Sequence, residues 1–263
     1  MMYLIIGRTG SGKTHLANLL ERHGLSRVKS RTTRAPRSES EDGYIFVSEE
    51  DAAACQNRIT DTVINGATYY TTPDDLVEKD FYVIDPIGAK KLAEVMPDET
   101  FVILYVSAAD DALRKAHATN RDDAYTPEAF DARNADEDEQ FSEFERQIDD
   151  STDMSAMDMP DNVRAVHVIV NDYAPETLWN EAVAQRNQLV LIRRIATLVT
   201  DAAKLGVMKS DESGHILTHD RDGKEVWHST EETALMLLFD RDAFYGFMCT
   251  MMVRSDRMFT LDE

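Results

Sequence analysis

The sequence predicts an α/β fold in which helices cover both faces of a parallel sheet. Four short apolar runs are typical of buried strands: residues 2–6, Phe81–Ile84, Phe101–Val106 and Ala165–Val170. A helical pattern follows each of the first three runs. Strands that alternate with helices form parallel sheets covered on both faces, and we therefore expect this architecture here.

The composition indicates a folded chain with room for one large domain and a small appendage. The chain has 263 residues, 43% of them hydrophobic, and a formal net charge of −21. This charge repels DNA and RNA, so we expect no nucleic-acid polymer as a partner. Cys55 and Cys249 lack the spacing of metal ligands and suit a reducing compartment. No apolar stretch is long enough to cross a membrane, and we expect a cytoplasmic protein without a membrane partner.

A glycine-rich loop with the pattern G-x-x-x-x-G-K-T occupies residues 7–14, directly after the first apolar run. Its glycines let successive N–H groups face phosphate oxygens, and Lys13 supplies an ammonium group to the β- and γ-phosphates. The Thr14 hydroxyl can bind Mg²⁺. A chance glycine turn is the alternative, but the strand before and the helix after are what phosphate binding requires. The predicted ATP-binding residues of the loop are Gly7, Thr9, Gly10, Ser11, Gly12, Lys13 and Thr14.

Asp85 ends the apolar run Phe81–Ile84. A carboxylate at the carboxyl end of a buried strand is typical of a metal-associated acid in phosphate-loop proteins. The alternative is a helix N-cap, which the following Pro86 favours. The two roles are compatible, and we predict Thr14 and Asp85 as the residues that bind Mg²⁺.

Two segments differ in composition and in hydrophobic pattern from the alternating strands and helices. Residues 28–80 are rich in Arg, Ser, Thr and Tyr, with short strand patterns at Tyr44–Val47 and Ala67–Thr71, and predict a small β-rich insertion. Residues 115–160 are expected to form a lid. Its acidic part begins as a helical pattern, and from Asp149 to Asp161 we expect a mobile loop.

Five blocks of sequence, in order, resemble the guanylate kinase family over residues 2–185. They are Thr32-Thr33-Arg34-x-Pro36-Arg37, Asp42-Gly43-Tyr44-x-Phe46-Val47-Ser48, Tyr69-Tyr70, Ile84-Asp85-x-x-Gly88-Ala89-Lys90, and Val168-Ile169-Val170-Asn171-Asp172. Taken alone, the arginines around residue 34 would be a solvated basic turn. The resemblance implies a P-loop kinase domain at residues 1–185 that transfers the γ-phosphoryl group of ATP to GMP or dGMP with the help of Mg²⁺.

The resemblance also implies roles for individual residues. The phosphate of the acceptor would be bound by Arg34, Arg37, Tyr44 and Tyr70, and its base would be read by Ser30, Asp61 and Thr72. Arg121 and Arg133 would be the lid arginines that neutralise charge on the transferred group. Asn171 joins the ATP-binding residues, and Lys13, Arg34, Arg121 and Arg133 form the predicted catalytic set.

Several positions depart from the pattern of the family. Asp61 stands where glutamate is usual, Val83 where a second aspartate is usual, His117 where a lid arginine is common, and Thr71 where glycine is usual. The departures at Asp61 and Val83 fall on residues for the base and the metal, whereas the glycine-rich loop and the phosphate-binding arginines match the family pattern. Two alternatives stay open: a P-loop kinase for another acceptor, such as a modified nucleotide or a sugar phosphate, or a nucleotide-binding interaction module without turnover.

Residues 186–263 lie outside the resemblance and predict a small α+β extension. The long helical pattern that starts near Pro175 ends near Leu205, and a hairpin of His215–Thr218 with Glu225–His228 follows. An apolar helical stretch from Glu231 to Met252 closes the chain. Its methionines suit packing against the kinase domain, and the alternatives are a homodimer contact or a regulatory module.

Overall fold

The computed structural model describes two compact units, Met1–Ala184 and Gln185–Glu263. It describes all residues except 37, 40, 65, 121–125, 151–156, 220–223 and 260–263, and for residues 64, 149, 150 and 252–259 it describes only the backbone. The division between the units lies one residue before the boundary proposed from the sequence.

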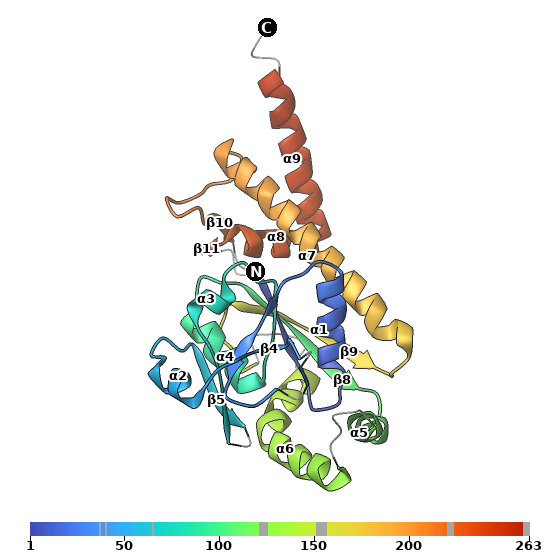
Figure 1. Ribbon diagram of the computed structural model, residues 1–263. Coiled ribbons are helices and arrows are strands. Elements are labelled where there is room, and N and C mark those ends of the chain that lie inside the picture. The colour runs from blue at the N-terminus through green and yellow to red at the C-terminus, as the bar shows by residue number, and fades with distance from the viewer. Residues whose placement is uncertain are drawn as a thin grey trace. The chain divides into compact units, whose positions relative to one another are not determined.

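The first unit alternates strands and helices around two sheets (Figure 1). Its elements are β1 (Met2–Ile6), α1 (Lys13–Arg22), β2 (Arg27–Val28), β3 (Ser30–Thr32), β4 (Tyr44–Phe46), α2 (Glu49–Ala54), β5 (Thr60–Ile64), β6 (Ala67–Thr71), α3 (Pro73–Leu76), β7 (Phe81–Val83), α4 (Pro86–Val95), β8 (Phe101–Ala108), α5 (Asp111–Thr119), α6 (Pro127–Asp150) and β9 (Val163–Asn171). Helix α7 (Pro175–Lys204) begins in this unit and ends in the second.

The main sheet has five strands in the order β2-β7-β1-β8-β9, all parallel. The parallel sheet expected from the apolar runs is therefore confirmed. Strand β2 was not predicted, because two residues are too few to give a pattern. Strand β1 lies in the middle and is buried throughout, so the loop that follows it leaves the sheet from its centre.

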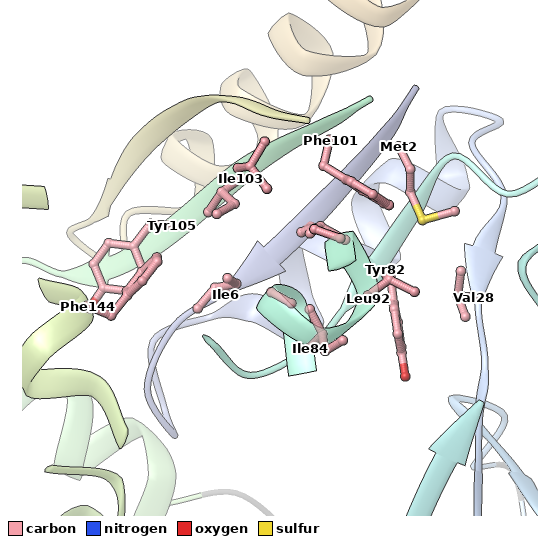
Figure 2. Close-up of a cluster of buried hydrophobic side chains, with 14 of the residues drawn as sticks. Met2, Ile6, Val28, Tyr82, Ile84, Leu92, Phe101, Ile103, Tyr105 and Phe144 are labelled. Atoms are coloured by element: carbon pink, nitrogen blue, oxygen red, sulfur yellow. The ribbon is translucent and has the colours of Figure 1, made fainter. Parts of the chain in front are cut away.

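Helices cover both faces of this sheet. Alternate residues of each strand point to opposite faces, so both faces present apolar side chains to the helices. One face carries Met2, Ile6, Tyr82, Phe101 and Ile103, which pack with side chains of α4 and α6 (Figure 2). Phe144 of α6 meets Tyr105 of β8, with ring centroids 5.6 Å apart. The other face packs against α1, whose Leu16 and Leu20 are fully buried.

The β-rich insertion predicted at residues 28–80 is a second sheet of four strands. The strand order is β4-β3-β6-β5, with β3 parallel to β4 and antiparallel to β6. Strands β3 and β5 were not predicted as strands. Their residues, Ser30–Thr32 and Thr60–Ile64, are largely polar and lack a clear alternation.

The loop expected at residues 149–161 holds for residues 157–161, whose backbone is irregular, but residues 149 and 150 belong to a helix. Helix α6 continues to Asp150, and Met157 is buried in the cluster that also holds Phe141 and Phe144. Met159 packs partly buried against the same cluster. The acidic composition of this segment does not indicate such packing. Met157 and Met159 supply the apolar surface that packs on the cluster.

The second unit contains the end of α7, β10 (Ile216–His219), β11 (Glu225–His228), α8 (Thr230–Phe239) and α9 (Arg241–Phe259). Strands β10 and β11 form the predicted antiparallel hairpin, and its expected turn at residues 220–223 lies outside the described residues. The single helix expected from Glu231 to Met252 is wrong. Two helices replace it, because the Asp240 carboxylate accepts a hydrogen bond from the Ala243 N–H at 2.9 Å and caps the start of α9.

Candidate phosphate-binding site

The candidate site lies at the carboxyl ends of the parallel strands. Residues 7–12 connect β1 to α1, Asp85 follows β7, and Asn171 ends β9. Because the strands are parallel, these positions share one edge of the sheet, where ligands of open α/β sheets bind. The fold thus brings residues 7–12, Asp85 and Asn171 to the same edge, although they lie far apart in the sequence.

Two glycines of the loop have backbones and surroundings that admit no side chain. Gly10 has a φ of +84° and Gly12 a φ of +104°, in the region that L-residues rarely adopt. A Cβ atom at Gly12 would lie 2.5 Å from Nδ2 of Asn171, and one at Gly10 would lie 2.8 Å from the carbonyl oxygen of Arg114. The loop can therefore follow this path only with glycine at both positions.

Four consecutive carbonyl groups of the loop each accept a hydrogen bond from a side chain. The contacts are Lys13 Nζ to Arg8 O at 2.7 Å, an Arg114 guanidinium N–H to Thr9 O at 3.0 Å, Tyr173 Oη to Gly10 O at 2.9 Å, and Asn171 Nδ2 to Ser11 O at 2.8 Å. In a trans peptide the C=O and N–H point in opposite directions. The contacts to Thr9 and Ser11 therefore turn the N–H groups of Gly10 and Gly12 away from the side chains that hold the carbonyls, as a phosphate cradle requires. The Ser11 N–H donates to the Arg8 carbonyl at 3.1 Å within the loop.

A cleft of about 420 Å³ opens beside the loop. Five of the eight predicted ATP-binding residues line it: Gly10, Gly12, Lys13, Thr14 and Asn171. His117 stacks on Tyr173 at its edge, with ring centroids 4.1 Å apart and planes 11° from parallel. Burial raises the pKa of Tyr173 to about 12, so the phenol keeps the proton that it donates to Gly10.

Helix α6 contacts the loop through a polar face. Both nitrogens Nε and Nη2 of Arg8 donate to the Glu145 carboxylate at 2.7 Å, and Asp138 also bonds Arg8. Glu137 accepts hydrogen bonds from the N–H of Thr9 at 2.9 Å and from its hydroxyl at 2.5 Å. Arg133, a predicted lid arginine, donates from Nε to Glu137 at 3.2 Å. The predicted partner Arg121 lies outside the described residues.

The acceptor residues form two groups in the second sheet. In the first, the Arg34 guanidinium lies over the rings of Tyr44 and Phe46, 5.3 and 5.5 Å from their centroids. Glu41 binds the same guanidinium through two contacts of 2.6 and 3.2 Å, and this hydrogen bonding raises the pKa of Arg34. Arg37 lies outside the described residues. The Arg34 fork that is expected to bind the acceptor's phosphate is thus paired with the Glu41 carboxylate.

The second group surrounds the residues expected to read the base. Arg58 donates to Asp61 at 2.9 Å and lies over the ring of Tyr70, 4.5 Å from its centroid. The Ser30 hydroxyl bonds the hydroxyl of Tyr82 at 2.8 Å. Both the N–H and the hydroxyl of Thr72 donate to Asp75, at 2.9 and 2.8 Å, and cap the start of α3. Thr72 is thus engaged locally.

The predicted metal ligands have different surroundings. Thr14 is exposed at the start of α1. Asp85 accepts from the Gly88 N–H at 2.8 Å and is the N-cap of α4, so the capping interpretation is confirmed. A carboxylate that makes one such contact has lone pairs left for a cation. In the part of the chain that the structure describes, no group of three or more His, Cys, Asp and Glu could hold a metal ion.

Three residues that contact the loop were missed in the sequence. Arg114, Tyr173 and Glu137 contact loop residues that are 105, 163 and 128 positions away along the chain. None of the three belongs to a recognisable motif. Only the three-dimensional packing of α5, α6 and the segment after β9 brings them to the loop.

Comparison with solved structures finds kinases. The chain is similar to a guanylate kinase from Anaplasma phagocytophilum, with 18% identity, a TM-score of 0.46, and coverage of 72% of this chain and 84% of that one. It is also similar to a sugar kinase from Janibacter sp. HTCC2649, with 14% identity, a TM-score of 0.36, and coverage of 70% and 92%. No family model and no curated protein matches the chain. The function proposed below therefore rests on the residues of the site.

Proposed function

We propose that this chain is a nucleoside monophosphate kinase that transfers the γ-phosphoryl group of ATP to GMP or dGMP and releases ADP and GDP or dGDP. The observation that carries the proposal is the set of four side-chain contacts to the carbonyls of residues 8–11, beside Lys13 and the 420 Å³ cleft. Such a loop binds the phosphates of a nucleoside triphosphate. Transfer then depends on positioning and charge neutralisation more than on covalent chemistry.

On the acceptor side, Arg34, Arg37, Tyr44 and Tyr70 would bind the phosphate of the monophosphate, and Ser30, Asp61 and Thr72 would contact its base. Asp61 suits guanine because a cyclic amide N–H and an exocyclic amine both donate hydrogen bonds. Arg121 and Arg133 would neutralise the transferred group. No general base is required if the acceptor phosphate is already ionised.

Mg²⁺ would be held by Thr14 and Asp85, together with the phosphates of ATP. The exposed Thr14 hydroxyl and the carboxylate of Asp85 are hard oxygen ligands, as this ion prefers. The bound ion would supply charge to the phosphate oxygens. The chain itself positions the loop, the lysine and the arginines.

The test is a screen of acceptors that measures ADP release from ATP and Mg²⁺ with each nucleoside monophosphate in turn. The expected result is stimulation by GMP or dGMP, and loss of the stimulation in Lys13→Ala. Asp61→Ala should then weaken the preference for guanine. ATP binding without release of ADP for any monophosphate would contradict the proposal and favour a binding module.

One observation favours a second candidate, a P-loop kinase with another acceptor. Asp61 is already bonded to Arg58, so the carboxylate expected to read guanine has a partner within its own sheet. A modified nucleotide or a sugar phosphate would use the phosphate-binding residues without Asp61. In that case Asp61→Ala should leave the order of preferred acceptors unchanged.

A further inference from the structure

Glu137 is a buried carboxylate that faces the phosphate loop and that no motif assigns. Only 4% of the residue is exposed, on a helix that is otherwise largely acidic and solvent-facing. A carboxylate this buried needs donors, and Glu137 has three: the N–H and the hydroxyl of Thr9, and Nε of Arg133. Two of these donors belong to the loop and the third belongs to a predicted catalytic arginine.

The peptide group between Arg8 and Thr9 is held from both sides. Lys13 Nζ donates to its carbonyl at 2.7 Å, and Glu137 accepts from its N–H at 2.9 Å. The C=O and N–H of a trans peptide point in opposite directions, so Glu137 and the lysine contact opposite edges of this peptide group. Rotation of this peptide would break both contacts. Glu137 therefore helps to keep the Arg8 carbonyl directed at the lysine that is expected to meet the γ-phosphate.

The same carboxylate also sets the place of Arg133. Arg133 and Glu137 are one helical turn apart on α6, and oxygen Oε1 of Glu137 receives both the Thr9 hydroxyl and Nε of Arg133. One oxygen atom thus joins the loop to the guanidinium. Arg8 and Glu145 make a second contact between the loop and α6, about two turns further along the helix.

We propose that Glu137 is a positioning residue that holds Arg133 in register with the phosphate loop, so that Arg133 and Lys13 reach the transferred phosphoryl group together. This role rests on the proposed function. Glu137 does not touch the reacting atoms. It acts on catalysis through Arg133 and on ATP binding through the peptide between Arg8 and Thr9.

The test compares Glu137→Gln with Glu137→Ala in the full chain, with kcat for GMP phosphorylation and Kd for ATP measured separately. Glutamine still offers one oxygen to the Thr9 N–H but loses the charge that holds Arg133. Glu137→Gln should therefore lower kcat by at least about tenfold and change the Kd for ATP by less than about threefold. Glu137→Ala should lower kcat and raise the Kd by about tenfold or more. Glu139→Gln, an exposed acid on the same helix, is the matched control and should change neither.

A double-mutant cycle separates positioning from general destabilisation. If Glu137 acts on kcat through Arg133, then Glu137→Gln should lower kcat no further once Arg133→Ala is present. Multiplicative losses in the double variant, or a lower Tm with unchanged kcat, would overturn the proposal.

Failure of the proposed reaction gives a different pattern. If the wild type binds ATP but phosphorylates no acceptor, the proposed kinase reaction is wrong. The Kd values for ATP still test whether Glu137 orients the peptide between Arg8 and Thr9. Equal ATP affinity in Glu137→Gln and Glu137→Ala would then overturn this role, whereas about tenfold weaker binding in the alanine variant would support it.

Discussion

Single side chains determine how the peptide planes of residues 8–12 are oriented. The donors come from α1, α5 and the end of β9, and the acceptor Glu137 comes from α6. Each contact is an ordinary hydrogen bond, worth about 1 kcal/mol in net stability. Their joint effect is larger for binding than for folding, because a cradle for phosphate needs all its N–H groups in place before the ligand arrives.

Replacement of Gly12 by alanine should disrupt the loop more than the backbone angle alone explains. The new Cβ would lie 2.5 Å from Asn171 Nδ2 and 3.0 Å from a methyl group of Leu178. We expect a loss of at least about 2 kcal/mol in the free energy of unfolding and ATP binding weakened by about tenfold or more. Urea unfolding and calorimetric titration with ATP measure the two effects.

Gly24→Ala is the matched control. Gly24 also has a positive φ, +86°, but no atom lies within 4 Å of the position of its Cβ. Gly24→Ala should cost only about 1 kcal/mol of unfolding free energy through backbone strain and should leave ATP binding unchanged. Equal losses of ATP affinity in both variants would contradict the role given to the packing around Gly12.

Asn171→Asp should weaken ATP binding without a change in side-chain size. Nδ2 of Asn171 donates to Ser11 O, and its Oδ1 accepts from the N–H of Tyr173 at 2.9 Å. A carboxylate keeps the second contact and sets a charged oxygen against the Ser11 carbonyl. We expect about 1–3 kcal/mol of destabilisation and a higher Kd for ATP. An unchanged Kd would show that the Ser11 carbonyl needs no donor.

At the scale of elements, the sequence predicted those that local pattern determines. The apolar strand, glycine loop and helix at residues 2–22 were expected, and so were β7, β8 and β9 within a few residues. Strands β2, β3 and β5 were missed because they are short or polar. The break at Asp240 was missed because apolar residues come both before Asp240 and after Asp242, and only the capping contact of Asp240 reveals the start of α9.

The candidate site was predictable in part for the same reason. The loop lies within eight consecutive residues, so its pattern is visible in the sequence. The contacts of Arg114, Glu137 and Tyr173 with the loop depend on how distant elements pack. No single-sequence pattern encodes such contacts.

The tie between β3 and α3 should weaken in acid. Arg31 donates to Asp75 through two contacts of 2.9 Å, and Thr72 adds two more. Burial favours the neutral carboxyl group, but the hydrogen bonds from Arg31 and Thr72 outweigh it and hold the pKa of Asp75 below its ordinary value. Since the folded pKa is lower than the unfolded value of about 3.9, the stabilisation is complete above about pH 5 and is lost as the pH falls through the folded pKa.

Urea unfolding of the wild type and Asp75→Asn at about pH 6 and about pH 3 tests this linkage. The wild type should lose more of its unfolding free energy between the two pH values than the variant does. The variant should be the less stable of the two near neutral pH. An identical pH dependence would contradict the stabilising role of the charged Asp75.

Helix α6 is held by its apolar face as well as by its contacts with the loop. Phe144 is 4% exposed and packs on Tyr105, so Phe144→Ala should cost about 3–5 kcal/mol of unfolding free energy. Glu143→Ala removes an exposed pair with Arg146 on the same helix and should leave the unfolding free energy nearly unchanged. Chemical denaturation of both variants gives the comparison, and similar losses would contradict the packing of α6 on the sheet.

At the scale of the whole molecule, an acidic chain concentrates cations around one loop. The net charge is −21, yet Arg8, Lys13, Arg114 and Arg133 all contact the loop or its immediate partners. Carboxylates pair with three of these cations: Glu145 with Arg8, Asp111 with Arg114, and Glu137 with Arg133. Of the helices that the structure describes, none has the length and apolar character to span a membrane.

A homodimer contact through the second unit is the alternative proposal to a packed accessory region. Exposed apolar side chains there include Trp227, Met236, Phe239 and Tyr245. Light scattering coupled to size exclusion should then give twice the mass of the chain, and Phe239→Ser with Tyr245→Ser should return it to the mass of one chain. A monomeric wild type at micromolar concentration would contradict the proposal and leave the unit as a packed accessory.

Transfer of the labelled γ-phosphoryl group from ATP to GMP, with Mg²⁺, tests the central claim most directly. Wild type and Lys13→Ala are compared, and the label is followed into the product. Label in GDP from the wild type, reduced by at least about a hundredfold in Lys13→Ala, is the predicted result. Wild-type protein that binds ATP but leaves the label out of every nucleoside diphosphate would contradict it.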